Sequence, residues 1–170
     1  MPVAEQWLSD SFSLQELLVS EVATRFGYAE QFEPSPKVVY NLRLLCVHVL
    51  QPLRNALGYP IRVQSGYRCP RLNERIGGAR ESQHLQGKAA DIMDLHNGNA
   101  FLLQTIVQLG LPFDQVIDEF GLAWIHVSYD PFRTRQQVLQ SFRDEHGHMR
   151  FRRLNPASEL VGTDGSPLVL

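Results

Sequence analysis

The sequence predicts an α+β domain in which helices pack on one face of a small, mainly antiparallel sheet. Helical apolar spacing dominates the first third of the chain, and short alternating segments follow it. The chain has 170 residues, of which 44% are hydrophobic, enough for one substantial core but too few for two ordinary domains. We therefore expect one domain over residues 1–155. Residues 156–170 carry Pro, Gly and Ser without periodicity, which predicts an irregular tail.

Two N-terminal segments have the apolar periodicity of helices. The first covers residues 11–27, where Ser13 and Glu16 have the spacing of a capping box. The second covers residues 35–58, and Pro52 is expected to bend its last turn because proline disrupts a helix interior. Both helices are expected to contribute apolar faces to the core.

The rest of the chain alternates shorter elements. In order, we expect a strand over 61–65, a short helix over 66–78, a strand over 87–95, a helix over 99–110, strands over 114–120 and 123–130, and a final short helix over 133–142. The last two strands are joined by a short loop around Gly121, which predicts a hairpin.

Composition excludes several classes of partner. The formal net charge is -2, so the chain lacks the broad basic field of a nucleic-acid-binding protein. No window approaches eighteen apolar residues, which argues against a membrane span, and the N-terminus has no signal-peptide pattern. The two cysteines, Cys46 and Cys69, do not imply a disulfide framework. We expect a monomer.

The stretch SQHLQGKAADI, residues 82–92, carries the polar residues of most interest. His84 and Asp91 are seven residues apart, and Gly87 permits the chain to fold back between them. His126, in WIH, lies on a strand predicted to run beside the first one. Two imidazoles and one carboxylate make a three-ligand zinc site whose fourth position is left to water, the pattern of a catalytic zinc. The pair His84 and Asp91 alone is equally compatible with a turn histidine and a surface carboxylate.

SQHLQGKAAD resembles the Ser-x-His-x-x-Gly-x-Ala-x-Asp signature of the zinc D-alanyl-D-alanine carboxypeptidase family, and WIH resembles its Trp-x-His. Relatives in that family include vancomycin-resistance dipeptidases and phage L-alanyl-D-glutamate endopeptidases. The resemblance implies a fold shared with the hedgehog signalling domain and one zinc ion held by His84, Asp91 and His126. It also implies the stem peptide of peptidoglycan as the substrate class.

Two further residues are candidates for substrate handling. Arg68, in SGYR, resembles a substrate-binding and transition-state-stabilising arginine of the family, and its guanidinium can fork onto a carboxylate or a carbonyl. An arginine between a strand and a turn also often pairs only with a surface carboxylate. Ser82 can donate to a substrate carboxylate or hold a ligand in place, and it can equally cap a turn.

The general base departs from the family pattern. Close relatives place a carboxylate three residues before the last histidine, but that position is Ala123 here. If the hairpin loop has an even number of residues, Glu119 lies opposite Trp124 and shares a face with His126. An odd-numbered loop would instead bring Asp118 opposite His126. We expect Glu119 to be the base, with Asp118 as the alternative and a catalytically impaired domain as the third possibility.

Two functions follow from these residues. The first is a zinc peptidase that cuts the peptidoglycan stem, either as a D-Ala-D-Ala carboxypeptidase or as an endolysin-type endopeptidase. The second is a zinc-binding module that binds cell-wall peptide or a protein partner without catalysis. The missing signal-peptide pattern favours an enzyme that stays in the cytoplasm until release, or one of phage or prophage origin that acts on the cell wall.

Overall fold

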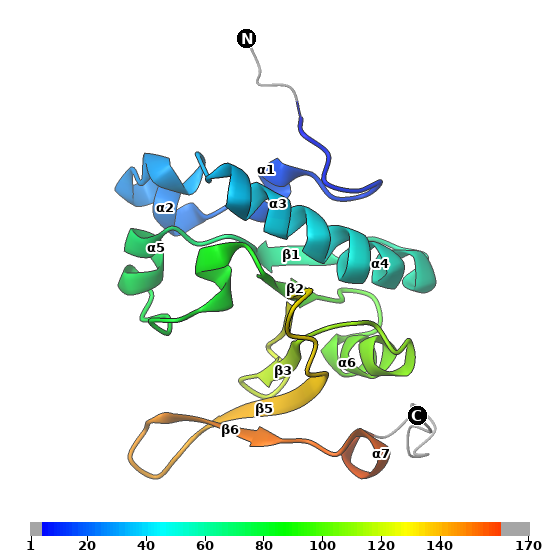
Figure 1. The fold of residues 1–170 in the computed structure, drawn as a ribbon. Coiled ribbons are helices and arrows are strands. Elements are labelled where there is room, and N and C mark those ends of the chain that lie inside the picture. Colours follow the sequence, from blue (N-terminus) through cyan, green and yellow to red (C-terminus); the bar gives the residue numbers. More distant parts are fainter. Residues whose placement is uncertain (1–4, 161–170) are drawn as a thin grey trace.

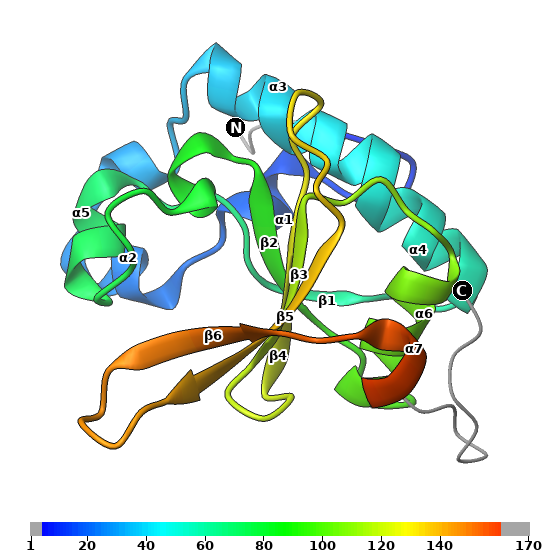
Figure 2. The ribbon, with the colours of Figure 1, turned by 60° about the horizontal axis from the view of Figure 1, so that its bottom comes forward.

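A six-stranded sheet and a layer of helices make up the computed structural model, which describes residues 5–160 (Figures 1 and 2). The helical elements are α1 (Leu14–Leu18), α2 (Glu21–Phe26), η1 (Ala29–Gln31), α3 (Pro36–Leu45), η2 (Cys46–Leu50), α4 (Gln51–Leu57), α5 (Pro70–Arg75), η3 (Gln83–Gln86), α6 (Asn99–Gln108) and α7 (Pro156–Glu159). The strands are β1 (Arg62–Ser65), β2 (Ala89–Met93), β3 (Gln115–Glu119), β4 (Trp124–Ser128), β5 (Gln137–Arg143) and β6 (Met149–Arg153).

The sheet has the strand order β1-β2-β4-β3-β5-β6. Its neighbours run antiparallel except β3 and β5, which are parallel. Figure 1 shows the helical layer of α1 to α4 on one side and the β5–β6 ribbon on the other. The predicted α+β class with a mainly antiparallel sheet is therefore confirmed.

Side chains alternate between the two faces of the central strands because successive residues of a strand point to opposite sides. One face carries apolar residues that join the core cluster together with α3, η2, α4 and α6. These apolar strand residues are Ala90, Ile92, Val116, Ile125, Val127 and Val138. The opposite face carries Asp91 and His126, which are direct partners across β2 and β4, and Glu119. We call this opposite side the site face.

Both long N-terminal helices are interrupted. The first predicted helix divides after α1, because the Ser20 hydroxyl accepts the Ala23 N–H and starts a second helix. The second contains the π-helical turn η2, which ends at Leu50, two residues before Pro52, where a bend was expected. A wider turn accommodates a residue that has no N–H to donate and whose ring crowds the preceding turn.

The hairpin of β3 and β4 has the even-numbered loop on which the choice of Glu119 depended. Glu119 pairs with Trp124, so residues 120–123 form the loop, and Ile117 pairs with His126. Phe120, Gly121 and Leu122 have positive φ angles of 52°, 66° and 65°. The alternative register, with Asp118 opposite His126, is wrong: Asp118 pairs with Ile125 and points to the core-facing side.

The C-terminal part of the domain differs from its prediction. Residues 133–142 were expected to form a helix, but residues 137–143 form β5. These residues form a strand because they pair with β3 on one side and β6 on the other, and this pairing outweighs their local helix propensity. The pairing buries Val138 and Ser141. The expected irregular tail is also corrected in part, because Asn155 caps the short helix α7. Residues 161–170 lie outside the described part of the chain.

Two expected absences concern cysteines and membrane spans. Cys46 and Cys69 are both buried and unpaired, and burial raises the pKa of the Cys46 thiol to about 12. Within residues 5–160, no helix has the length and apolar character needed to cross a membrane.

Candidate metal centre

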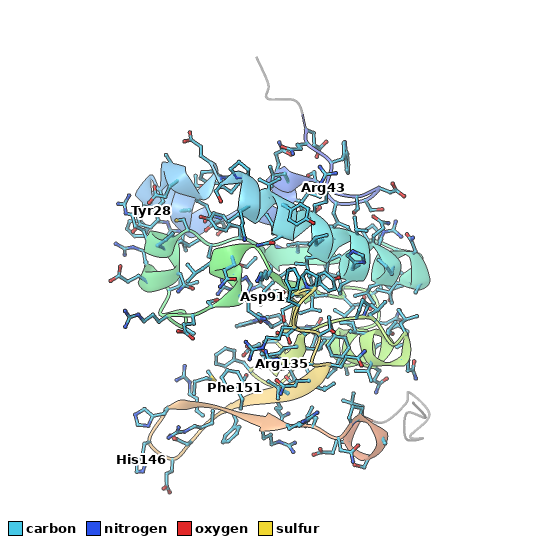
Figure 3. All side chains as sticks on the ribbon, in the orientation of Figure 1. Tyr28, Arg43, Asp91, Arg135, His146 and Phe151 are labelled. Atoms are coloured by element: carbon cyan, nitrogen blue, oxygen red, sulfur yellow. The ribbon has the colours of Figure 1, made fainter. Side chains whose placement is uncertain are left out.

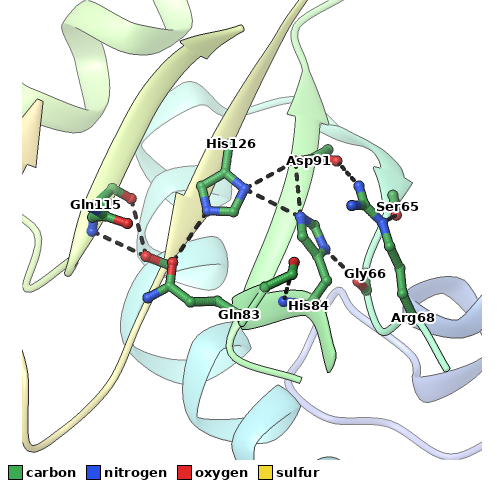
Figure 4. Close-up of polar contacts among 10 residues, drawn as sticks. Ser65, Gly66, Arg68, Gln83, His84, Asp91, Gln115 and His126 are labelled. Carbon is green, nitrogen blue, oxygen red and sulfur yellow. Dashed lines mark hydrogen bonds and ion pairs between the residues drawn. The ribbon is translucent and has the colours of Figure 1, made fainter. Parts of the chain in front are cut away.

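Three separate elements bring His84, Asp91 and His126 together (Figure 4). His84 lies on the short turn η3, which ends at Gly87 in the left-handed conformation (φ 68°). Asp91 lies on β2 and His126 on β4, where they are direct cross-strand partners. All three residues are buried. Figure 3 places Asp91 in the interior of the molecule, far from His146 at the tip of the β5–β6 ribbon.

The donor atoms of these residues form an equilateral triangle. His84 Nε2 lies 3.2 Å from His126 Nδ1 and 3.2 Å from Asp91 Oδ1, and His126 Nδ1 lies 3.2 Å from Asp91 Oδ1. Tetrahedral coordination with bonds of about 2.0–2.1 Å places neighbouring ligands about 3.3 Å apart. The chemistry and the spacing of the donors therefore fit one zinc ion, with a fourth position to spare.

The outer nitrogen of each imidazole fixes its tautomer. His84 Nδ1 lies 2.7 Å from the carbonyl oxygen of Gly66, and His126 Nε2 lies 3.4 Å from Gln83 Oε1. Both oxygens only accept hydrogen bonds, so the outer nitrogens carry the protons and the inner nitrogens keep their lone pairs. Burial lowers the pKa of His84, which favours the neutral ring that a metal requires.

Gln83 is itself held in orientation by a partly buried ion pair. Its Nε2 donates to Asp114 Oδ2 at 2.8 Å, which forces Oε1 toward His126 because a carboxylate can only accept. Asp114 also receives Arg135 through Nε at 2.7 Å and Nη2 at 2.8 Å. The chain of contacts Arg135–Asp114–Gln83–His126 therefore links a residue just before β5 to the candidate ligand.

Arg68 contacts Asp91 through Nη2, and its Nε donates to Ser65 Oγ at 3.0 Å. The Arg68 side chain is only 15% exposed, so it is not the surface arginine of the simpler interpretation. The positive guanidinium of Arg68 beside Asp91 favours the ionised form of this carboxyl. Asp91 is therefore an ionised carboxylate with one oxygen toward the imidazoles and the other toward Arg68.

Gly66 allows the backbone to approach close enough to support His84. A Cβ atom at this position would lie 2.3 Å from the carbonyl oxygen of Leu17, so any larger residue would displace the segment. That displacement would also move the carbonyl oxygen of Gly66, which accepts the His84 Nδ1 proton. The glycine of SGYR thus has a direct structural link to the candidate centre.

Ser82 lies at the start of η3. Its hydroxyl accepts the backbone N–H of His84 at 3.3 Å and so caps the turn that carries the histidine. Ser82 also lines a polar cavity of about 350 Å³ together with Gln83 and Arg133, and none of the three candidate ligands is part of its lining. The turn-capping interpretation of Ser82 describes its observed contact, while a contact with substrate stays a prediction.

Glu119 lies on the site face, diagonal to His126 across β3 and β4. Burial raises the pKa of Glu119, while a hydrogen bond from Ser141 opposes that rise. Asp118 instead secures the hairpin loop: its Oδ1 accepts the Leu122 N–H at 2.5 Å, and its Oδ2 accepts from Gln140 at 2.8 Å. Of the two candidate bases, the structure brings only Glu119 to the side of the metal ligands.

Sequence reasoning did not find the groups that support these residues, namely Gly66, Gln83, Asp114, Arg135 and Ser141. Gln83 stands inside the recognised motif and was passed over because the motif leaves its position open. Arg135 and Ser141 fall in the segment that was expected to be a helix, so no strand register was available to place them.

Comparisons with known proteins agree with this geometry. The sequence profile described as peptidase M15 matches residues 10–128, which is most of the chain and includes all three candidate ligands. A zinc D-Ala-D-Ala carboxypeptidase of Streptomyces albus G is 42% identical over 50 residues. That match covers 29% of this chain and 20% of the relative, so the chain aligns with only a small part of that enzyme. On the extent of the profile match, the chain belongs to the peptidase M15 family.

Proposed function

We propose that this protein is a zinc-dependent peptidase that hydrolyses a bond in the peptidoglycan stem peptide, as a D-Ala-D-Ala carboxypeptidase or an endolysin-type endopeptidase. The observation that carries the proposal is the triangle of His84, Asp91 and His126 donors, with sides of 3.2 Å, in a chain of the peptidase M15 family. The substrate class is supported by the similarity to the Streptomyces albus G enzyme.

In this proposal, His84 Nε2, Asp91 Oδ1 and His126 Nδ1 hold one zinc ion. When bound, zinc polarises the scissile carbonyl and makes water a stronger nucleophile at neutral pH. The protein's own contribution is to keep both imidazoles neutral and aimed inward, through Gly66 and Gln83. Asp91 supplies the negative charge, and Arg68 keeps its carboxylate from turning away.

Glu119 accepts the proton of the attacking water. It needs no contact with the donor triangle for this role, only a position on the same face within reach of the water. Burial raises its pKa above that of an ordinary glutamate, which brings it closer to the pH at which a general base works best. Glu119 thereby replaces the carboxylate that relatives carry at the position of Ala123.

Arg68 and Ser82 handle the substrate. Arg68 uses Nε and one Nη nitrogen in contacts with Ser65 and Asp91. Its other Nη nitrogen has no hydrogen-bond partner within residues 5–160, so it can donate to the oxygen that gains charge as the peptide bond breaks. Ser82 keeps its hydroxyl proton for a substrate carboxylate while its oxygen caps η3.

The second candidate function is a binding module that retains zinc and has lost catalysis. The observation that favours it is Ala123, which removes the carboxylate from its usual position. Both functions require the same metal, so metal binding cannot separate them. The two functions differ in their need for a general base, so replacing the candidate base distinguishes them.

The test is hydrolysis of purified peptidoglycan by the zinc-loaded protein, with and without a chelator, followed by analysis of the released fragments. The key variant is Glu119→Gln, and its matched control is Glu145→Gln, the same substitution at a side chain that is 86% exposed. We expect Glu119→Gln to keep its zinc and lose hydrolysis by about 100-fold or more, because a positioned base contributes about that much. Glu145→Gln should retain the parent rate, because its carboxylate is exposed and lies outside the candidate site.

Each outcome separates the candidates. Chelator-sensitive turnover that disappears in Glu119→Gln supports the peptidase with Glu119 as its base. Parental turnover in Glu119→Gln removes this residue from the mechanism. Zinc binding without turnover of any peptidoglycan by the parent protein supports the binding module, and the fragments identify the bond if turnover is found.

A further inference from the structure

Strand β5 borders the candidate base from outside the segment that matches the family. The family profile ends at residue 128, whereas β5 covers Gln137–Arg143 and pairs in parallel with β3. The register matches Asp118 with Gln140, so the next residues, Glu119 and Ser141, are neighbours on the site face. A strand that follows the matched segment therefore supplies the residue beside Glu119.

Ser141 is buried, with 4% of its surface exposed, and its hydroxyl lies between the Phe120 backbone and Glu119. The oxygen accepts the backbone N–H of Phe120 at 3.1 Å. Its proton is left for the carboxylate of the neighbouring Glu119, and a hydrogen bond from Ser141 lowers the pKa of that carboxylate. A hydroxyl has a single proton, and the Phe120 N–H occupies an acceptor site on its oxygen, so the hydrogen bond to Glu119 has a fixed direction.

The contact between Ser141 and Phe120 also holds the β3–β4 loop in place. Phe120 is the first of three consecutive residues with positive φ in the β3–β4 loop, a conformation unfavourable for non-glycine residues. Ser141 holds the start of this loop from β5, and Asp118 holds its other end through the Leu122 N–H. The backbone that follows Glu119 is therefore fixed on both sides.

We propose that Ser141 is the positioning residue for the general base: through one hydroxyl it fixes both the Glu119 carboxylate and the Phe120 backbone, so that β5 is part of the catalytic site. This inference rests on the proposed function of Glu119. Ser141 itself touches neither the metal ligands nor the substrate in this arrangement. Its effect on catalysis passes through Glu119.

Several charged groups act on Glu119 besides Ser141. His126 on β4 favours its ionised form, whereas Asp91 on β2 and Asp118 on β3 disfavour it. On β5, Arg143 points over the ring of Phe120 at 5.8 Å. Burial has the largest effect and raises the pKa of Glu119, and the hydroxyl of Ser141 opposes that rise. Removing the hydroxyl alone should therefore move this pKa upward while the other groups stay in place.

The experiment compares Ser141→Thr with Ser141→Val in the zinc-loaded protein. The two replacements have nearly the same shape and both suit a strand, but only threonine has a hydroxyl. Ser141→Thr should retain activity near that of the parent. Ser141→Val should lose about 10-fold to 100-fold in kcat, as is typical when a hydrogen-bond partner of a metal-site residue is removed. Its acidic limb in the pH profile of kcat/KM should move to higher pH, since the base then loses its proton later.

A double variant tests whether the effect passes through Glu119. In a Glu119→Gln background, Ser141→Val should reduce the residual rate no further, because the base it positions is absent. An equal loss in both backgrounds would show that Ser141 only maintains the fold and would overturn the proposal. If Ser141→Val does not fold, Ser141→Ala and Ser141→Cys provide a second pair of variants without the hydroxyl.

One measurement does not depend on turnover. NMR titration of the Glu side-chain carboxyls, with the Glu119 signal assigned from Glu119→Gln, should give a higher pKa in Ser141→Val than in Ser141→Thr. An unchanged pKa would overturn the positioning role even if the protein is an active peptidase. A raised pKa in a protein that hydrolyses no peptidoglycan would keep the contact and reject the proposed function, so the two failures are distinguishable.

Discussion

The Nε2 atom of His84 lies 3.2 Å from the Nδ1 atom of His126, and neither nitrogen carries a proton in the tautomers fixed by Gly66 and Gln83. Two lone pairs and the carboxylate of Asp91 therefore face one another in a buried space. Without a cation between them, this arrangement is electrostatically unfavourable. The fold thus accepts a cost at this point that a bound metal would offset.

The first prediction is that zinc stabilises the protein and that the donor triangle binds it. Zinc at a thousand times its dissociation constant should add about 4 kcal/mol to the free energy of unfolding. His84→Ala and His126→Ala should each lose most of the bound zinc and most of this stabilisation. His146→Ala, at a side chain that is 71% exposed, is the control and should keep a full equivalent. Metal analysis and thermal unfolding with and without chelator measure both effects; full zinc content in both site variants would reject the ligand assignment.

The second prediction concerns Gln83, which connects His126 to the partly buried ion pair of Asp114 and Arg135. Gln83→Ala should weaken zinc affinity by about 10-fold to 100-fold, because the ring of His126 loses the acceptor that fixes its tautomer. The matched control is Gln86→Ala, the same substitution at an exposed position of the same short turn. Competition with a chromophoric chelator gives both affinities, and equal values would show that Gln83 does not support the ligand.

The third prediction revises what the sequence indicated for Arg68. The interpretation of Arg68 as a surface ion pair implies little loss of stability when this residue is replaced, but the structure buries Arg68 against Asp91. Arg68→Ala should therefore destabilise the metal-free protein by about 3–5 kcal/mol, the usual effect of leaving one member of a buried ion pair alone. In the zinc-loaded protein it should also lower kcat/KM by about 100-fold.

The control for Arg68 is Arg71→Ala, at a side chain that is 62% exposed and pairs with Glu30 at the surface. Its effect on unfolding should stay below about 1 kcal/mol. Denaturant unfolding under chelation measures the first effect for both variants, and hydrolysis rates measure the second. Parental stability of Arg68→Ala would show that Asp91 does not need its partner, and parental turnover would withdraw the catalytic role.

The candidate ligands could be found from the sequence because metal-binding residue types occur at fixed spacing within short motifs. His84, Asp91 and His126 occur at fixed places in motifs, and the even-numbered hairpin loop correctly placed Glu119 opposite Trp124. Helices with marked caps were also found, although the split at Ser20 was missed because both halves continue the same apolar pattern.

What the sequence did not provide was pairing between distant segments. Residues 137–143 have side chains that suit either a helix or a strand, and only the open edge of β3 decides in favour of a strand. Arg135 and Ser141 could therefore not be linked to the site in advance. The hydrogen bond from His84 to the carbonyl oxygen of Gly66 could not be predicted either, because every residue has a backbone carbonyl and the residue type does not indicate this contact.

The last prediction is a pH dependence of stability at Asp114. Burial by itself would raise the pKa of Asp114, but the hydrogen bonds from Arg135 outweigh it and hold this pKa below that of an ordinary aspartate. The carboxylate therefore contributes stability above the pKa of the unfolded chain, about 3.9, and this contribution is lost as the pH falls through the lower pKa of the folded protein. Asp114→Asn should be less stable than the parent at pH 7, and the difference should shrink below about pH 4.

Denaturant unfolding across this pH range measures the difference. Asp10→Asn, at an exposed carboxylate, is the control, and its stability should follow that of the parent at every pH. A constant difference between Asp114→Asn and the parent at all pH values would mean that the carboxylate does not bind Arg135 as an ion. Because Asp114 also orients Gln83, the same variant should bind zinc more weakly at pH 7, which separates a loss at the site from a general loss of stability.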